Sequence, residues 1–287
     1  MNGNWVPYHK SPQKYIAMFQ KVAHVMHEYA PNVAMLWCPF SVPQRLITDY
    51  YPGDNAVDWV GVNIYSVLYN DNDPARNAQL RNPADQLAYI YKKYASRKPI
   101  AIGEYGASHL EKLDLKPRED YAIIKMNQFY NSLKLIYPRV KMVNWLSMNA
   151  IVHAEPGRQL NDYSLLDSAT VLAAYHNLLQ SRYFLKDFEP HAETAHRYVP
   201  AQDGMQVSQE ATFAGWMKCY DNLPTAVWLL DGNELKRINE PGDYHIDINT
   251  HNLSNGPHTL TLVGLDTHGI EFGRQTITFF VRNHIYQ

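Results

Sequence analysis

Few features of the sequence point to a disulfide-stabilised, membrane-spanning or nucleic-acid-binding protein. Its 287 residues include only two cysteines, Cys38 and Cys219, so it has neither a disulfide framework nor metal-site cysteine spacing. No run of about 18 apolar residues occurs, so we predict no membrane-spanning helix. The first residues lack the charged start and apolar core of a signal peptide. A net charge of −2 without a basic stripe argues against nucleic acid as a partner.

The unusual feature of the composition is its aromatic content. The chain has 21 Tyr, 6 Trp and 9 Phe, together 13% of its residues. Aromatic rings fill hydrophobic cores, and they also stack on the apolar faces of sugar rings; composition alone favours the first interpretation. The 13 histidines are scattered without the spacing of a metal-binding pair, so the sequence predicts no metal and no cofactor.

The first 185 residues alternate strand and helix signals. Short apolar runs predict strands at 32–38, 57–65, 99–104 and 140–146. Helical periodicity, with proline at three of the four starts, predicts helices at 12–29, 83–95, 117–136 and 169–184. Because strands alternate with helices of this length, we expect parallel strands joined by right-handed crossovers.

After about residue 187 the pattern changes to short alternating strands separated by turn signals. We predict strands at 211–220, 226–230, 244–248, 258–265 and 275–282. This pattern is typical of an antiparallel β-sandwich of fewer than about 90 residues. The predicted domains are therefore 1–187 and 201–287, with a linker at 188–200 that contains Pro190 and Pro200.

The carboxyl ends of the four predicted parallel strands carry the candidate functional residues, because catalytic groups of α/β barrels lie at that end. These ends read Trp37-Cys38-Pro39, Asn63-Ile64-Tyr65, Gly103-Glu104-Tyr105-Gly106 and Asn144-Trp145. Glu104 ends an apolar strand, where a carboxylate without partners costs several kcal/mol. It is either a functional carboxylate or one that is paired with a nearby loop arginine.

Four segments, in order, resemble glycoside hydrolase family 26, the β-mannanase family of the large retaining (β/α)8 clan. They are Met1-Asn-Gly-Asn-Trp5, Tyr51-Pro-Gly-Asp54 with Val57-Asp-Trp-Val-Gly61, Lys98-Pro-Ile-Ala-Ile-Gly-Glu-Tyr-Gly106 and Asn144-Trp145. The resemblance covers residues 1–185. It implies the C-terminal half of a (β/α)8 TIM barrel, strands five to eight plus the end of strand four, followed by an all-β immunoglobulin-like sandwich.

The resemblance also implies a role for each matching residue. Glu104 would be the nucleophile, and Tyr65 would hydrogen-bond its carboxylate. Trp145 would be the platform under the sugar that is cleaved, and Trp5 would line the cleft. Asn63 shares the face of Tyr65, although the family usually has Asp there. Trp145 and Tyr65 could instead be core residues.

The implied activity is retaining endo-β-glycoside hydrolysis of a polysaccharide, β-mannan or a related β-glycan, without a cofactor. The resemblance also implies that the full-length protein is secreted or lies at the cell surface. The family's acid/base glutamate directly precedes the motif that begins at Met1, so we expect this chain alone to be inactive. The alternative is a non-catalytic carbohydrate-binding or cell-surface protein. His153 and Glu155 could face the cleft but are expected in a solvated loop. Trp216 and Trp228 are expected in the sandwich core.

Overall fold

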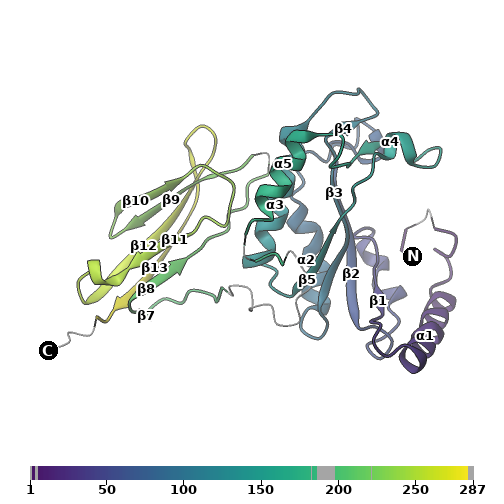
Figure 1. Ribbon diagram of the computed structural model, residues 1–287, viewed down its shortest axis with the longest axis horizontal. Coiled ribbons are helices and arrows are strands. Elements are labelled where there is room, and N and C mark those ends of the chain that lie inside the picture. The colour runs from purple at the N-terminus through teal and green to yellow at the C-terminus, as the bar shows by residue number, and fades with distance from the viewer. Residues whose placement is uncertain (1, 4–5, 182, 186–197, 221, 284–287) are drawn as a thin grey trace. The chain divides into compact units, whose positions relative to one another are not determined.

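The computed structural model describes residues 2–3, 6–181, 183–185, 198–220 and 222–283 (Figure 1). They divide into two compact units, Met1–Met126 with Tyr137–Ala174, and Asn127–Ile136 with Tyr175–Gln287. Most of the linker expected at 188–200 lies outside the described residues, so the boundary near residue 187 stays a prediction. In the described part of the chain, no helix has the length and apolar character needed to cross a membrane.

The first unit contains a parallel four-stranded sheet with the order β1-β2-β3-β5, so each strand pairs with the next long strand in the sequence. The strands are β1 (Leu36–Trp37), β2 (Trp59–Ser66), β3 (Ile100–Ala107) and β5 (Val140–Trp145). This confirms the mixed α/β fold with parallel strands. The first strand is shorter than expected: Val33, in the predicted run, is 42% exposed and packs into no core.

Helices precede, separate and follow these strands. They are α1 (Pro12–Tyr29), α2 (Pro83–Tyr94), α3 (Glu119–Leu135), α4 (Ala150–His153) and α5 (Ala169–Leu178). The start of α2 follows from its sequence: the Asn82 side chain accepts a hydrogen bond from the amide of Ala84 at 3.0 Å, and Pro83 needs no amide partner there. The helix then packs against β2 through buried Leu87 and Ile90.

The core of this unit explains why the strands read as continuous apolar runs. Val60, Val62 and Ile64 of β2 are fully buried, as are the consecutive residues Ile100, Ala101 and Ile102 of β3. Strands of a parallel sheet are covered on both faces, so residues that point in opposite directions are both buried. Burial of each such side chain stabilises the unit by about 1.5–3 kcal/mol, and so holds the two strand ends in a fixed relation.

Short segments extend beyond the carboxyl ends of these strands. They include the antiparallel pair β4 (Leu110–Glu111) and β6 (Asn161–Asp162), and the 3-10 turns η1 (Gln44–Leu46), η2 (Thr48–Tyr50) and η3 (Asn70–Asn72). Two-residue strands have no periodicity that a sequence pattern can reveal, so neither β4 nor β6 was predicted. The pair matters because β4 comes shortly after β3, which carries Glu104, and β6 belongs to the segment that follows β5, which ends at Trp145.

The second unit is rich in β-structure, as expected. Its five-stranded sheet has the order β10-β9-β12-β13-β7, and β11 pairs with β8. The strands are β7 (Met205–Val207), β8 (Glu210–Phe213), β9 (Thr225–Leu230), β10 (Asn233–Ile238), β11 (Ile246–Asn249), β12 (Gly256–Leu265) and β13 (Glu271–Val281), with the turn η4 (Thr250–Asn252). Trp228 is buried in the core beside Phe213 and Phe279, as predicted, whereas Trp216 is half-buried.

A buried histidine in this unit should make its stability depend on pH. His258 Nδ1 lies 2.7 Å from Asp231 Oδ2, and Nε2 lies 2.9 Å from the carbonyl oxygen of Ser254. Both ring nitrogens face acceptors, which favours the imidazolium. The hydrogen bond to Asp231, and then that to Ser254, raises the pKa of His258 above 6.5.

We therefore expect His258→Gln to lower the free energy of unfolding by about 1 kcal/mol at pH 6, since Asp231 is partly exposed. A raised pKa in the folded state gives stability that is complete below about pH 6.5 and is lost as the pH rises through the folded-state pKa. Thermal unfolding should thus separate wild type and variant more at pH 6 than at pH 9. Exposed His251→Gln is the control; an equal effect of His258→Gln at both pH values would contradict the prediction.

Candidate active site

The candidate site lies at the carboxyl ends of β2, β3 and β5, where strand pairing brings the predicted residues together. Asn63 is in register with Glu104, and Tyr65 is in register with Gly106 two residues further along. On the other side of β3, Tyr105 is in register with Trp145. Because parallel strands end at the same edge of a sheet, three separate segments of sequence supply one group of side chains.

Glu104 is held by Tyr65. The Tyr65 hydroxyl donates a hydrogen bond to Glu104 Oε2, and the carboxylate is only partly buried. Burial, and then this hydrogen bond, raise the pKa of the Tyr65 phenol well above 10, so the phenol stays protonated and remains a donor. In the described residues no ion pair involves Glu104. The partner is thus a tyrosine hydroxyl and not the loop arginine of the alternative interpretation.

Gly103 allows the neighbouring strands to approach the residue before the carboxylate. The pairing of β2 with β3 shifts register between Val62 and Asn63, opposite this glycine. A Cβ atom at position 103 would lie 2.6 Å from Cys38 Sγ and 2.7 Å from Asn63 Oδ1. Such distances are shorter than van der Waals contact, so any larger residue here would push both side chains away from the site.

Cys38 is a site residue that the sequence analysis did not identify. Its thiol donates a hydrogen bond to Asn63 Oδ1 at 3.0 Å. Burial raises the pKa of Cys38 to about 12, and the charge of Glu104 adds to this effect, while a backbone hydrogen bond from Gly103 opposes it. Cys38 is therefore a neutral thiol that orients Asn63. Its position at the end of the first predicted strand was the signal that could have revealed it.

Trp145 ends β5 with its ring half-buried. Its ring meets that of Tyr105 edge-on, with centroids 5.4 Å apart, and Nε1 donates a hydrogen bond to the backbone oxygen of Tyr163 at 2.9 Å. Asn144 Nδ2 lies 3.4 Å from the carbonyl oxygen of Gly103. The indole is thus fixed in orientation by two neighbours, and part of its surface remains accessible.

The remaining candidates are placed differently. Trp5 lies outside the described residues, so its expected position in the cleft stays a prediction. His153 and Glu155 are exposed in the segment that follows β5, as the solvated-loop expectation required. Neither Cys38 nor Cys219 forms a disulfide bond. Within the described ranges, no group of three or more His, Cys, Asp or Glu residues is arranged to hold a metal ion.

Comparison with known proteins gives one family match. The model of glycosyl hydrolase family 26 matches residues 1–95, a range that includes Asn63 and Tyr65 but ends before Glu104. No curated protein matches the chain.

Among solved structures, the modular endo-β-1,4-mannanase of Cellulomonas fimi is 15% identical with a TM-score of 0.42, covering 98% of this chain and 62% of that one. The endo-β-1,4-mannanase of Thermotoga petrophila is 12% identical with a TM-score of 0.35, covering 96% and 62%. This chain thus spans less than two thirds of either enzyme. The family match over residues 1–95 supports the assignment of this segment to glycosyl hydrolase family 26.

Proposed function

We propose that the chain carries the nucleophile side of a retaining endo-β-glycosidase of the mannanase type, with Glu104 as the nucleophile. One observation carries the proposal: a partly exposed carboxylate lies within an otherwise buried parallel strand, shortly after its buried run Ile100–Ile102, and accepts a hydrogen bond from Tyr65 of the neighbouring strand. A hydroxyl donor stabilises the ionised carboxylate without neutralising its charge, as a nucleophile requires.

The two oxygens of this carboxylate have different roles in the proposed reaction. Tyr65 binds Oε2, so the attack on the anomeric carbon falls to Oε1. A bond forms between Oε1 and the anomeric carbon, while the bond from that carbon to the leaving oxygen breaks and its electron pair stays on the oxygen. Water then hydrolyses the glycosyl ester with net retention of configuration. The accessible part of the half-buried Trp145 ring would support the sugar ring.

The finer assignments rest on the resemblance and are part of the proposal. The parallel strands are strands five to eight of a (β/α)8 barrel in domain 1–187, and 201–287 is an immunoglobulin-like sandwich. The substrate is a β-mannan or a related β-glycan, met outside the cell or at its surface. Protonation of a sugar leaving group requires a second carboxylate besides the nucleophile. We therefore expect cleavage of polysaccharide to depend on a carboxylate other than Glu104.

Covalent trapping tests Glu104 without the acid. The reagent is 2,4-dinitrophenyl 2-deoxy-2-fluoro-β-mannobioside: dinitrophenolate leaves without protonation, and the fluorine slows hydrolysis of the glycosyl ester. We expect the chain to gain the mass of one fluorinated mannobiosyl group, on the peptide that contains Glu104. Labelling at another carboxylate, such as buried Glu111, would reassign the nucleophile. Binding of mannooligosaccharides without any labelling would favour the non-catalytic carbohydrate-binding alternative.

A further inference from the structure

Tyr163, directly after β6, contacts three elements of the candidate site. Its backbone amide donates to the carbonyl oxygen of Met148 at 3.0 Å. Its backbone oxygen accepts the hydrogen bond from Trp145 Nε1 at 2.9 Å. The orientation of the indole is therefore set by a residue 18 positions further along the chain, and the two move together if that segment moves.

The side chain of Tyr163 reaches the other half of the site. Its ring lies 5.6 Å from the ring of Tyr65, measured between centroids. It also packs on the backbone of Gly106, where a Cβ atom would come within 2.8 Å of Tyr163 Cδ1. Gly106 is two residues beyond Glu104 on β3. The ring is thus in contact with the residue that binds the carboxylate and with the strand that carries it.

Burial and polar contacts fix the tyrosine in this position. Only 8% of Tyr163 is exposed, and burial, followed by the charge of Glu111, raises the pKa of its phenol. A side-chain hydrogen bond with Asn161 has the opposite effect. The phenol is therefore neutral throughout the working pH range, and its role is contact and not proton transfer.

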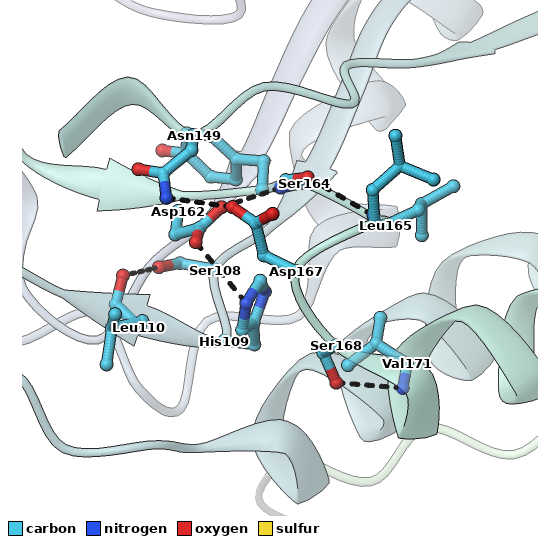
Figure 2. Close-up of polar contacts among 12 residues, drawn as sticks. Ser108, His109, Leu110, Asn149, Asp162, Ser164, Leu165, Asp167, Ser168 and Val171 are labelled. Atoms are coloured by element: carbon cyan, nitrogen blue, oxygen red, sulfur yellow. Dashed lines mark hydrogen bonds and ion pairs between the residues drawn. The ribbon is translucent and has the colours of Figure 1, made fainter. Parts of the chain in front are cut away.

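The residue before Tyr163 anchors the segment, as Figure 2 shows. Asp162 Oδ1 accepts a hydrogen bond from the amide of Ser164 at 2.8 Å, and Oδ2 lies 3.5 Å from His109 Nε2. The backbone oxygen of Asp162 accepts from the amide of His109 at 3.1 Å. Asp162 and His109 are both almost fully buried. These contacts attach the segment after β5, which contains Tyr163, to the segment after β3.

We propose that Tyr163 is a positioning residue that couples the Trp145 platform to the Tyr65–Glu104 pair. Its backbone orients the indole, and its ring keeps Tyr65 over the carboxylate, so both halves of the site adopt one arrangement. The inference rests on the proposed role of Glu104 as nucleophile. It assigns a function to a buried side chain that touches neither the sugar nor the reacting atoms.

The test is the rate of covalent trapping by the fluorinated mannobioside, measured against reagent concentration. Tyr163→Phe keeps the ring and the backbone, so we expect trapping within about twofold of wild type. Tyr163→Ala removes the ring, and we expect the maximal trapping rate to fall about tenfold and half-saturation to require more reagent, because Tyr65 and the indole are both displaced.

Two further variants separate positioning from loss of stability. Tyr94→Ala truncates another fully buried tyrosine of the same unit, and we expect its maximal rate and half-saturating concentration to match wild type at a temperature where it is folded. If Tyr163→Ala does not unfold cooperatively, Tyr163→Leu replaces it. A folded Tyr163→Ala or Tyr163→Leu variant with the wild-type rate and half-saturating concentration would overturn the proposal.

A second measurement distinguishes this proposal from the proposed function. The indole N–H resonance of Trp145, assigned by its loss in Trp145→Phe, should shift or broaden in Tyr163→Ala and stay in place in Tyr163→Phe. If wild type is not labelled at Glu104, the nucleophile assignment fails, and the coupling role of Tyr163 fails with it. If wild type is labelled at Glu104 but the Tyr163→Ala substitution changes neither the indole resonance nor the trapping rate, only the coupling role fails.

Discussion

Replacing Glu104 with alanine should slow the first release of dinitrophenolate from 2,4-dinitrophenyl β-mannobioside by about 10³-fold or more, as expected for loss of a covalent nucleophile. The activated group departs without an acid, so this first-turnover release reports on the nucleophile, whereas later turnovers also require hydrolysis of the glycosyl ester, in which the second carboxylate acts as base. Azide should then restore release of dinitrophenolate, since it fits the space that the carboxylate leaves. Attack from that face inverts the configuration, and proton NMR should identify an α-mannobiosyl azide.

The matched control for this substitution is Glu28→Ala. Glu28 lies on α1 with its side chain half-exposed, 3.6 Å from His24, and its loss should change turnover by less than about twofold. Glu104→Ala activity above about one per cent of wild type would remove Glu104 from the mechanism. A β-azide product would mean that azide enters from the opposite face, which a nucleophile at Glu104 does not allow.

The sequence predicted that Glu104 and Tyr65 lie on neighbouring parallel strands, and there is a physical reason for this. The strands that carry them, β2 and β3, are buried on both faces, so each appears in the sequence as an apolar run. The predicted bounds, 57–65 and 99–104, therefore lie close to the observed strands. The first polar residues after such runs emerge at the carboxyl edge of the sheet. Fold class and nucleophile candidate therefore follow from local patterns, and α1 was predicted with its observed bounds, Pro12–Tyr29.

Tyr163 and Cys38 escaped prediction because their roles depend on distant contacts. Tyr163 follows a two-residue strand, and its partners Tyr65 and Gly106 are far away in the sequence. One clue in the sequence is Gly106, because the absence of a side chain there leaves the space that the tyrosine ring fills. Cys38 reads as an ordinary apolar residue at a strand end until folding places its thiol against Asn63.

The edge strand β10 was missed for a different reason. Five of its six positions, Asn233–Arg237, are exposed, so no alternation of apolar and polar residues marks it. It forms by hydrogen bonding to β9, with the turn at Asp231 and Gly232 setting the register. Charged edge strands also limit pairing with other chains, and the composition that serves this purpose hides the strand from pattern analysis.

Tyr65→Phe should slow covalent trapping by about 10- to 150-fold, because a hydrogen bond to a charged group contributes about 1.5–3 kcal/mol. The ring, its packing and the backbone of β2 are kept, and only the hydroxyl on Glu104 Oε2 is lost. That hydroxyl holds one oxygen of the carboxylate in place, so its removal should lower the maximal trapping rate rather than the affinity for the reagent.

The pH dependence of trapping gives a further check on the Tyr65 hydroxyl. Because burial and the bond to Glu104 raise the pKa of Tyr65 well above 10, the wild-type chain should show no loss of trapping from tyrosine ionisation below that pH. Tyr91→Phe is the control: it removes a hydroxyl that accepts a hydrogen bond from the amide of Arg139 at 3.1 Å, and trapping should be unaffected. A wild-type trapping rate in a folded Tyr65→Phe chain would mean that the hydroxyl does not hold the reacting carboxylate, and Glu104 would then need another donor to act as the nucleophile.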